Sequence, residues 1–534
     1  MTTLKTRRGV SLLAVIAVAA GAAAVPGIAT AAPSASAFGV VATAERLPSL
    51  VDLDTNKTGS ITIHKLVKDA TNGTTEGTGL EDTTATGTPL DGAKFTVERL
   101  TNVDLTTQAG WEKLVGFNGD VATAKADGVD AAVEKTTAGG GLATFSNLPL
   151  GAYVVTETET PAGYVGSKPF IITVPMTNPK DLNKWVYDVH AYPKNSKAGV
   201  DKTVADEATP AIGSAISYTI KSDVPAVETL DFYDVVDQYD KRVELPEAGI
   251  TLKIINGKTG EVALTKGTDY KLIGATGTDG KTMFWTAEFT EAGRAKLVAN
   301  RKDDTTKVQM DLVGTVKDKV ESDGLFKNKA ILLPNEPSNG WKPNSGEVPP
   351  PDYPNSEVVS KFGKVKITKV SAADPTAKLK GAEFEVCQCM PQSTPTKNFD
   401  SVDATLDKKL SPAGVTTYVT DANGEVTIDG LRNNDWANNA KVANPGWYCL
   451  VETKAPEGFE LQTRPIAFQV LESNSTTANQ YTLETTVKDA PHNGGFRLPV
   501  TGAAGVGVLI AAGSALVAGA GAIAIANKRR KENA

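Results

Sequence analysis

Histidine is scarce in this chain, which has three among its 534 residues. His64, His190 and His492 are scattered and show none of the short spacings that are typical of zinc ligands. No hydrolytic triad of the Ser-His-Asp kind can be proposed from them either. The sequence therefore argues against a metalloenzyme and a hydrolase, and we expect neither a metal nor a cofactor.

Two short stretches resemble ligand-binding loops without meeting their requirements. ATGTDGKT at 275–282 fits a permissive phosphate-loop pattern, but the residues that follow, MFWTAEF, indicate a strand where a helix is required. DTNKTG at 54–59 resembles the opening of a calcium loop, yet its twelfth position is Lys65, where a bidentate carboxylate is needed. We predict no nucleotide binding at the first stretch and a turn at the second.

An excess of basic residues is also lacking. The chain has 55 Lys and Arg residues against 62 Asp and Glu residues, so its formal net charge is −7. Such a chain does not attract nucleic acid, whose binding depends on the neutralisation of phosphates. With 40% hydrophobic and 22% charged residues, the composition is that of folded globular material with room for three domains of ordinary size.

The start of the chain carries an export signal. Three basic residues precede an apolar run at 10–25, and small residues follow, with a predicted cleavage after Ala31. Residues 1–31 are therefore predicted to be a secretory signal peptide. The mature protein is expected to leave the cytoplasm.

The other end combines a pentapeptide with an apolar segment. Leu498, Pro499, Thr501 and Gly502 belong to LPVTG, which precedes an apolar run at 503–526 and a basic tail. Such a run is long enough to cross a bilayer, with the basic tail inside, so a simple membrane anchor is one interpretation. The order of pentapeptide, apolar run and basic tail instead resembles the sorting signal that sortases cut between Thr and Gly. The apolar run would then hold the protein in the membrane only until it is cut.

Helical periodicity is nearly absent from the interior and is limited to short patches such as EAGRAKLVAN. Short alternating segments with Gly, Pro, Asn and Asp between them predict an all-β chain. A Pro-rich stretch at 335–357 separates two segments of different pattern. We predict three sandwich domains, at 32–197, 198–357 and 358–495, followed by a sorting segment at 496–534.

The first and third predicted domains share a repeated pattern. GSITIHKL, PLDGAKFTVERL and YVVTETETPAGY correspond to GKVKITKV, KLKGAEFEVC and YCLVETKAPEGF. These domains resemble collagen-adhesin B-type immunoglobulin-like domains, and the middle segment resembles the related A-type. With the pilin motif around Lys194, the two E-boxes and LPVTG, the whole chain resembles the major shaft subunits of sortase-assembled Gram-positive pili, of the fimbrillin kind found in oral actinobacteria. Thr160 stands where the E-box usually has Ala.

The resemblance implies a role for Lys194, which directly follows Pro193. The proline fixes the backbone and lacks a donor, so we expect the strand to stop there and the lysine to lie at a domain edge. A sortase would hold one subunit through the Thr501 carbonyl, and the Lys194 amine of the next subunit would accept it. The implied product is a head-to-tail covalent fibre.

Strand alternation also places lysines in apolar cores. Val365, Ile367 and Lys369 share one face of their strand, and an unpaired ammonium there is very costly. In the family, such a lysine attacks a core Asn or Asp while a buried acid polarises the acceptor, which leaves an intramolecular isopeptide bond. The implied sets are Lys202, Asp237 and Asn328 in the middle domain, Lys369, Glu452 and Asp489 in the third, and Lys65, Glu157 and Asn195 in the first.

Several alternatives to these sets stay open. The family favours Asn where Asp489 stands, so Asn493 is a second candidate acceptor. Asp234 rivals Asp237, although the alternation of the strand favours Asp237. A buried salt bridge is the alternative to a bond in every set.

Cysteine is as scarce as histidine, and all three cysteines lie in one region. In an exported chain, this number indicates one disulfide with one thiol left over. Strand alternation places Cys387, Cys389 and Cys449 on the face opposite the core. The resemblance favours a bond between Cys389 and Cys449, with Cys387 as the alternative partner.

The resemblance implies a structural fimbrial subunit of the cell surface that is not an enzyme. Its expected partners are a pilus-specific sortase, identical subunits, a tip adhesin, peptidoglycan, and host or bacterial surface ligands, with membrane contact only before sorting. A monomeric wall-anchored adhesin that binds host matrix is the alternative. Lys194 discriminates between the two because only a pilin needs an acceptor.

Overall fold

The computed structural model describes residues 50–68, 77–182, 184–257, 260–317, 320, 323–337 and 339–492. The signal peptide, the LPVTG residues Leu498, Pro499, Thr501 and Gly502, and Asn493 lie outside this part. The chain divides into two compact units. The first consists of Met1–Ala208, Ala215–Lys317 and Phe326–Ser360, and the second of Thr209–Ser214, Asp318–Leu325 and Lys361–Ala534. No helix within the described ranges is long and apolar enough to cross a membrane.

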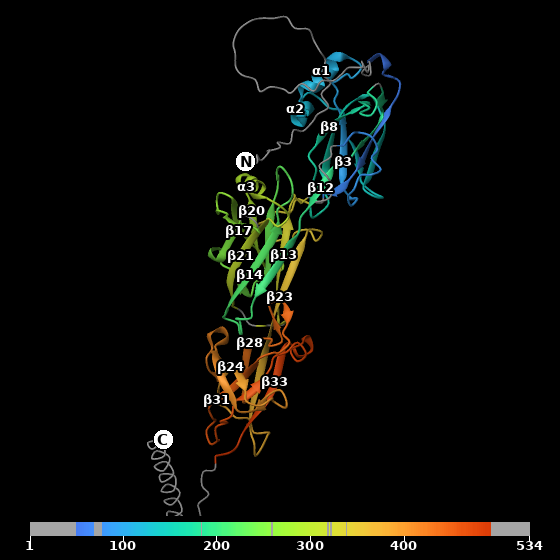
Figure 1. The fold of residues 1–534 in the computed structure, drawn as a ribbon. Helices are drawn as coiled ribbons and strands as arrows, with labels where there is room; N and C mark the ends of the chain where they lie inside the picture. The colour runs from blue at the N-terminus through green and yellow to red at the C-terminus, as the bar shows by residue number, and fades with distance from the viewer. Residues whose placement is uncertain are drawn as a thin grey trace, which may run out of the picture. The chain divides into compact units, whose positions relative to one another are not determined.

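The N-terminal part of the first unit is a sandwich of two sheets (Figure 1). One sheet has the order β11-β1-β5 and the other β4-β3-β6-β8. Ile61, Phe95, Phe145 and Val155 alternate inward from these strands and form the shared core. The strands are β1 (Gly59–His64), β3 (Lys94–Arg99), β4 (Val133–Thr136), β5 (Leu142–Leu148), β6 (Gly151–Glu159), β8 (Phe170–Val174) and β11 (Asp188–Ala191).

Two helices, α1 (Gln108–Gly116) and α2 (Val121–Ala126), cover the outer face of this sandwich. Ala152 and Val154 of β6 point outward and pack in one cluster with Phe117 and Ala124. The remaining short strands are β2 (Leu66–Lys68), β7 (Tyr164–Val165), β9 (Met176–Thr177), β10 (Trp185–Val186) and β12 (Lys194–Lys197). Of these, β2, β12 and β7 form a separate three-stranded sheet, with β12 in the middle.

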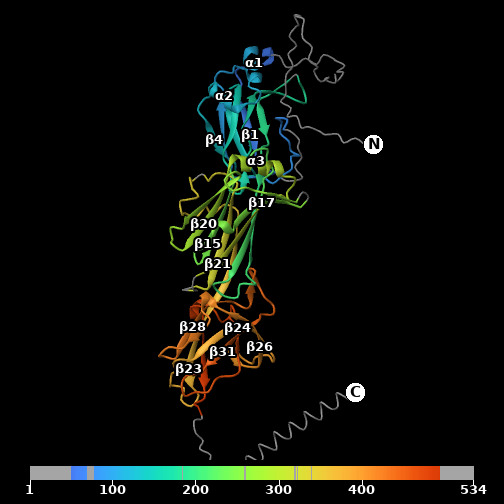
Figure 2. The same ribbon diagram turned by 90° about the vertical axis from the view of Figure 1, so that its left-hand side faces the viewer.

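A second pair of sheets follows within the same unit. One has the order β13-β14-β21-β17-β18, and the other includes β19-β20-β15-β22 and continues into β23. Figure 1 shows β13 beside β14, and Figure 2 shows β15 beside β20. The strands are β13 (Val200–Ala205), β14 (Ala215–Asp223), β15 (Asp234–Asp240), β16 (Val243–Glu244), β17 (Ile250–Asn256), β18 (Gly260–Ala263), β19 (Tyr270–Thr276), β20 (Thr282–Phe289), β21 (Lys307–Val316) and β22 (Leu325–Leu333).

Three local predictions from the sequence are confirmed. EAGRAKLVAN forms α3 (Glu291–Asn300), whose N-cap Thr290 accepts a hydrogen bond from Gly293. MFWTAEF lies in β20, and ATGTDGKT runs from the end of β19 through a turn into β20, so no helix follows it. Likewise, DTNKTG contains a turn in which Asp54 accepts from the backbone of Asn56.

The Pro-rich segment at 335–357 packs against a sheet. Trp341 and Tyr353 are buried, and they join a cluster with Val236, Phe284 and Ile331 on the outer face of the β20-β15-β22 layer. Burial of two aromatic side chains stabilises this position strongly. The segment therefore covers one face of the middle sandwich.

The second unit is a further sandwich. The long strand β23 (Asn355–Ser371), whose first residues belong to the first unit, pairs with β28 (Glu425–Arg432) and, in parallel, with β33 (Thr482–Asp489). The opposite sheet has β31 beside β24 at its centre (Figure 2). Its strands are β24 (Glu383–Pro391), β25 (Asp400–Ser401), β26 (Ala404–Leu410), β27 (Tyr418–Val419), β31 (Trp447–Lys454) and β32 (Ile466–Phe468), and β29 (Trp436–Ala437) pairs with β30 (Ala440–Lys441).

Candidate functional site

The predicted strand break at Pro193 lies between β11, which ends at Ala191, and β12, which begins at Lys194. The Pro193 carbonyl accepts a hydrogen bond from the Leu66 backbone, so the chain enters β12 beside β2. The Lys194 side chain is half-buried. It therefore stands at the first position of a strand that directly follows the break.

Three buried polar side chains meet at Asn195, the residue after Lys194. Lys65, at the junction of β1 and β2, has no exposed side-chain surface, and its Nζ lies 2.7 Å from Oε2 of Glu157 on β6. The Nδ2 of Asn195 donates to Oε1 of the same carboxylate at 2.6 Å. The first predicted set is thus brought together, and Glu157 lies between the lysine and the amide.

Burial dominates the chemistry of Lys65. Desolvation lowers the pKa of its ammonium from 10.5 to about 8, although the charge of Glu157 opposes this shift. The Nζ also lies 5.2 Å from the centroid of the Phe95 ring. The lysine can therefore lose its proton far more readily than a solvated lysine, which a nucleophilic amine requires.

The second cluster joins the two sheets of the middle sandwich. Lys202 points inward from β13 and forms a fully buried ion pair with Oδ1 of Asp237 on β15. Asn328 on β22 is buried and lies two residues from Ala330, which pairs with Asp237, so both side chains share one face. The Asn328 amide interacts with the Asp237 carboxyl, so the third member of the predicted set also lies in this cluster.

Opposite pKa shifts act within this pair. Burial lowers the pKa of the Lys202 ammonium and raises the pKa of the Asp237 carboxyl, while each charge counteracts the shift of the other. Asp234 is also buried, and desolvation raises its pKa to about 8. It lies on the opposite face of β15, however, and Asp237 is the acid that contacts Lys202.

The third cluster lies in the second unit. Lys369 on β23 has no exposed side-chain surface, and its Nζ lies 2.7 Å from Oε1 of Glu452 on β31. It also pairs with Oδ1 of Asp489 on β33, the strand parallel to β23. Desolvation by burial raises the pKa of the Glu452 carboxyl. The lysine thus lies within contact distance of both predicted acids, while Asn493 lies outside the described residues.

Comparison with known proteins identifies the family. The chain is 40% identical to a fimbrial subunit type 1 of Actinomyces viscosus, over 99% of both chains. This chain belongs to the fimbrial subunit family. A fimbrial subunit type 2 of Actinomyces naeslundii is 31% identical, over 90% of this chain and 92% of the relative. The full-length major pilin SpaD of Corynebacterium diphtheriae is 30% identical, covers 82% of this chain and 98% of its own, and has a TM-score of 0.59.

Family models match three segments of this fimbrial subunit. The N-terminal domain D1 of Gram-positive pilin subunits matches residues 56–196, a prealbumin-like fold domain matches 363–485, and the LPXTG cell wall anchor motif matches 490–534. The all-β fold with tandem sandwiches is confirmed. The anchor and the fimbrial relatives identify a cell-wall-anchored surface fimbria.

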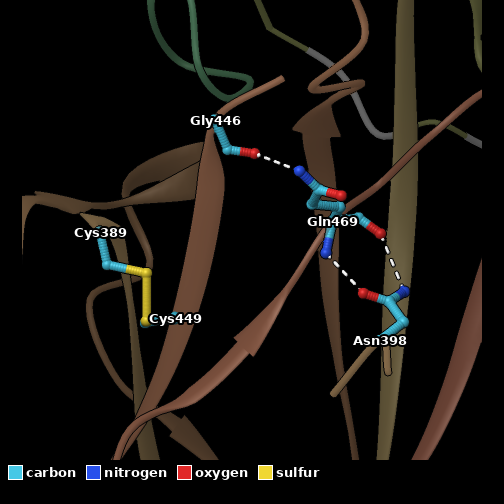
Figure 3. The surroundings of a disulfide bond; sticks show 5 residues. All are labelled: Cys389, Asn398, Gly446, Cys449 and Gln469. Atoms are coloured by element: carbon cyan, nitrogen blue, oxygen red, sulfur yellow. Dashed lines mark hydrogen bonds between the residues drawn. A yellow bond between two sulfur atoms is a disulfide. The ribbon is translucent and has the colours of Figure 1, made fainter. Parts of the chain in front are cut away.

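A disulfide links Cys389 on β24 to Cys449 on β31, with 5.8 Å between their Cα atoms (Figure 3). The strand register places Cys387 directly opposite Cys449, yet the bond runs diagonally to Cys389. Cys387 remains a buried thiol, and burial raises its pKa, which keeps it protonated. The bond spans 60 positions, and the chain-entropy model assigns it roughly 4 kcal/mol.

Side-chain hydrogen bonds hold the chain near this disulfide (Figure 3). The backbone N–H of Gln469 donates to Oδ1 of Asn398 at 2.7 Å, and Nδ2 of Asn398 donates back to the Gln469 carbonyl at 3.0 Å. The Gln469 side chain donates to the Gly446 carbonyl. The disulfide is therefore one of several contacts outside the core of this sandwich.

Two histidines that are far apart in the sequence lie side by side in the structure. The Nε2 of His64 and Nδ1 of His190 lie 2.8 Å apart, because β1 and β11 are parallel neighbours. The Tyr192 ring stacks on His64 with 4.4 Å between the ring centroids. The two histidines are 126 residues apart, so no short sequence motif could predict their contact. The described residues contain no group of three or more side chains suited to a metal.

We expect this histidine pair to weaken the first sandwich as the pH falls. Burial lowers the pKa of His64 below its ordinary value of 6.5, with a further contribution from His190, and Glu81 opposes the shift. Below about pH 6.5 the unfolded chain therefore binds a proton that the folded chain resists, so stability is lost as the pH falls. Hydrogen-exchange protection of β1 and β11 should fall between pH 7 and 5 in the wild type.

The matched variants separate this effect from general acid sensitivity. His64→Gln keeps a hydrogen-bonding side chain without the titration, so its protection should change less over the same pH range. His492→Gln removes an exposed histidine of the other unit and should behave as the wild type in β1. Equal pH dependence in the wild type and the His64→Gln variant would contradict the assignment.

Proposed function

We propose that this chain is the major structural subunit of a covalently polymerised surface fimbria that supports adhesion. One observation carries the proposal: the chain is 40% identical to a fimbrial subunit along its whole length, and it contains both LPVTG and a lysine directly after the strand break at Pro193. A polymer that grows head to tail needs both a donor and an acceptor in every subunit.

The joining reaction uses a pilus-specific sortase as partner. The sortase cysteine attacks the Thr501 carbonyl, and the segment that begins at Gly502 leaves. The resulting thioester is attacked by the Lys194 Nζ of the next subunit, the thiolate leaves, and an amide bond forms. A long lysine stem suits this step because it can enter a narrow active site. The membrane span holds the subunit only until this exchange.

The middle and third sandwiches are each further reinforced by an isopeptide bond from a buried lysine. The middle domain forms a bond between Lys202 and Asn328, with release of ammonia and with Asp237 as the acid. The third domain joins Lys369 to Asp489, with release of water and with Glu452 as the acid. Formation of a neutral amide removes the large desolvation cost of these buried ion pairs, which supports a bond over a permanent salt bridge.

The bonds fit a shaft that carries load. Lys202 lies on β13 and Asn328 on β22, which are near the start and the end of the middle domain that we propose at 198–357. Tension along the chain would then pass through the covalent link as well as through strand hydrogen bonds. The domains proposed at 32–197 and 358–495 would flank this reinforced segment.

A monomeric wall-anchored adhesin is the second candidate, because LPVTG and sandwich domains serve that function equally. An adhesin of this kind would bind host matrix or other cells directly. A fimbria would also be attached to peptidoglycan, but it would have a tip adhesin as an additional partner. Extraction of cell walls with hot SDS separates the two. The fimbria predicts a ladder of species that react with antibody to this chain, and the adhesin predicts one species of monomer size.

A further inference from the structure

Glu157 in the first sandwich is surrounded by hydrogen-bond donors. Its Oε2 accepts from Lys65 Nζ at 2.7 Å, from the Ser167 backbone at 2.8 Å and from Ser167 Oγ at 2.9 Å. Its Oε1 accepts from Asn195 Nδ2 at 2.6 Å. All four groups donate to this carboxyl. In an isopeptide reaction, the same carboxyl must instead donate a proton to the carbonyl of the acceptor.

The Ser167 hydroxyl connects the two charged groups. It accepts a hydrogen bond from Lys65 Nζ at 3.1 Å and donates its own proton to Glu157. A hydroxyl can accept and donate at once, so Ser167 links the lysine to the carboxyl through two hydrogen bonds. Asn195 also turns its amide nitrogen toward Glu157, whereas a reacting amide would present its oxygen to the acid.

The third sandwich provides an internal comparison. Its acid, Glu452, accepts a backbone hydrogen bond at 2.8 Å from Gln462, ten residues along the chain. Ser167 stands in the same relation to Glu157, also ten residues along. The Gln462 side chain turns away and donates to Ser401 instead. The two acid sites therefore share the backbone donor, and only the Glu157 site adds a serine hydroxyl; they also differ in the acceptor, which is Asn195 in the first sandwich and Asp489 in the third.

We propose that the Ser167 hydroxyl is a positioning group that holds Lys65 and Glu157 as an ion pair and so prevents the Lys65–Asn195 bond in the unpolymerised subunit. This inference rests on the isopeptide chemistry of the proposed function. In the withheld reaction, the neutral Lys65 Nζ attacks Cγ of Asn195, the C–Nδ2 bond breaks, and ammonia leaves. Glu157 would have to give a proton to the carbonyl oxygen and take one from the amine.

The position of Asn195 beside Lys194 links the Lys65–Asn195 bond to fimbrial assembly. Asn195 directly follows Lys194 on β12, so an early bond would fix the acceptor segment to the β1–β2 junction before a sortase reaches it. With the ion pair in place, β12 is held by noncovalent contacts, among them its hydrogen-bonded pairing with β2 and β7. The first sandwich would then gain its bond only after the neighbouring subunit has been joined.

Mass spectrometry of the purified, unpolymerised subunit tests the inference. The wild type should yield separate peptides for Lys65 and Asn195. Ser167→Ala should yield one joined peptide and lose the mass of one additional ammonia. Ser167→Thr keeps the hydroxyl and should restore the wild-type peptides, which a merely structural role of the side chain would not produce.

Further variants keep the result decisive. Ser167→Cys weakens the hydrogen bonds at nearly constant volume, so it replaces the alanine variant if that variant does not fold, and it should also show the joined peptide. A second substitution, Glu157→Ala, should abolish the joined peptide in the Ser167→Ala background. Lys65 joined to Asn195 in the wild-type subunit, or separate peptides in both the alanine and the cysteine variants, would overturn the inference.

The other two sandwiches distinguish failure of this inference from failure of the proposed function. If the Lys202–Asn328 and Lys369–Asp489 peptides are joined while the Ser167 variants stay unjoined, only the role of Ser167 is wrong. If no sandwich contains a joined peptide, the isopeptide chemistry itself is wrong, and the inference falls with it.

Discussion

Replacement of Lys194 by Ala is expected to abolish the SDS-resistant ladder and leave only monomer in the cell wall. Lys194 stands at the start of β12, directly after the break at Pro193, and we propose it as the sole amine that accepts Thr501. Without that amine, the sortase thioester has no acceptor on the next subunit. Immunoblotting of wall extracts measures the result as complete loss of every species larger than the monomer.

Lys197→Ala is the matched control for this experiment. Lys197 is an exposed lysine at the other end of the same strand, so its removal should leave the ladder intact. Both substitutions affect surface or half-buried side chains and should change stability by only about 0.5 kcal/mol. A persistent ladder in the Lys194→Ala strain would show that another lysine accepts Thr501.

Replacement of Asp237 by Ala is expected to prevent the bond in the middle domain. The wild-type subunit should be lighter by one ammonia through the Lys202–Asn328 bond, and the variant should retain that ammonia. The variant also leaves Lys202 buried without its partner, which alone costs about 3–5 kcal/mol. Intact mass and thermal unfolding of the purified subunit measure the two effects together.

Asp234→Asn controls for the removal of a buried acid from the same strand. Asp234 is buried as deeply as its rival, but its side chain lies on the face away from Lys202. This variant should therefore still lose ammonia through the Lys202–Asn328 bond. Loss of the bond in Asp234→Asn and its persistence in Asp237→Ala would reverse the assignment of the acid.

Period-two alternation explains how much of each cluster could be predicted. It places Lys369 with Val365 and Ile367 in a core, and it separates Asp237 from Asp234. These are local properties of single strands, and the buried lysines follow from them. The identities of the partners came from the family resemblance, because no local rule joins Lys202 to a residue on another sheet.

The unpredicted contacts depend on the register between distant strands and on loop paths. The His64–His190 pair exists only because β1 and β11 are parallel neighbours. Ser167 reaches Glu157 from outside any named strand, and a serine between a glycine and a lysine carries no sequence signal. Similarly, the positions of α1 and α2 could not be predicted from their own sequences. These helices pack on outward-facing apolar residues of β6.

Peptide mapping of purified fimbriae tests the central claim most directly. After proteolysis of the SDS-resistant polymer, mass spectrometry should find a branched peptide in which the carbonyl of Thr501 is joined to the Nζ of Lys194, with no residues after Thr501. Recovery of an unbroken Thr501–Gly502 bond throughout the polymer, or of Thr501 joined to a different lysine, would contradict the account.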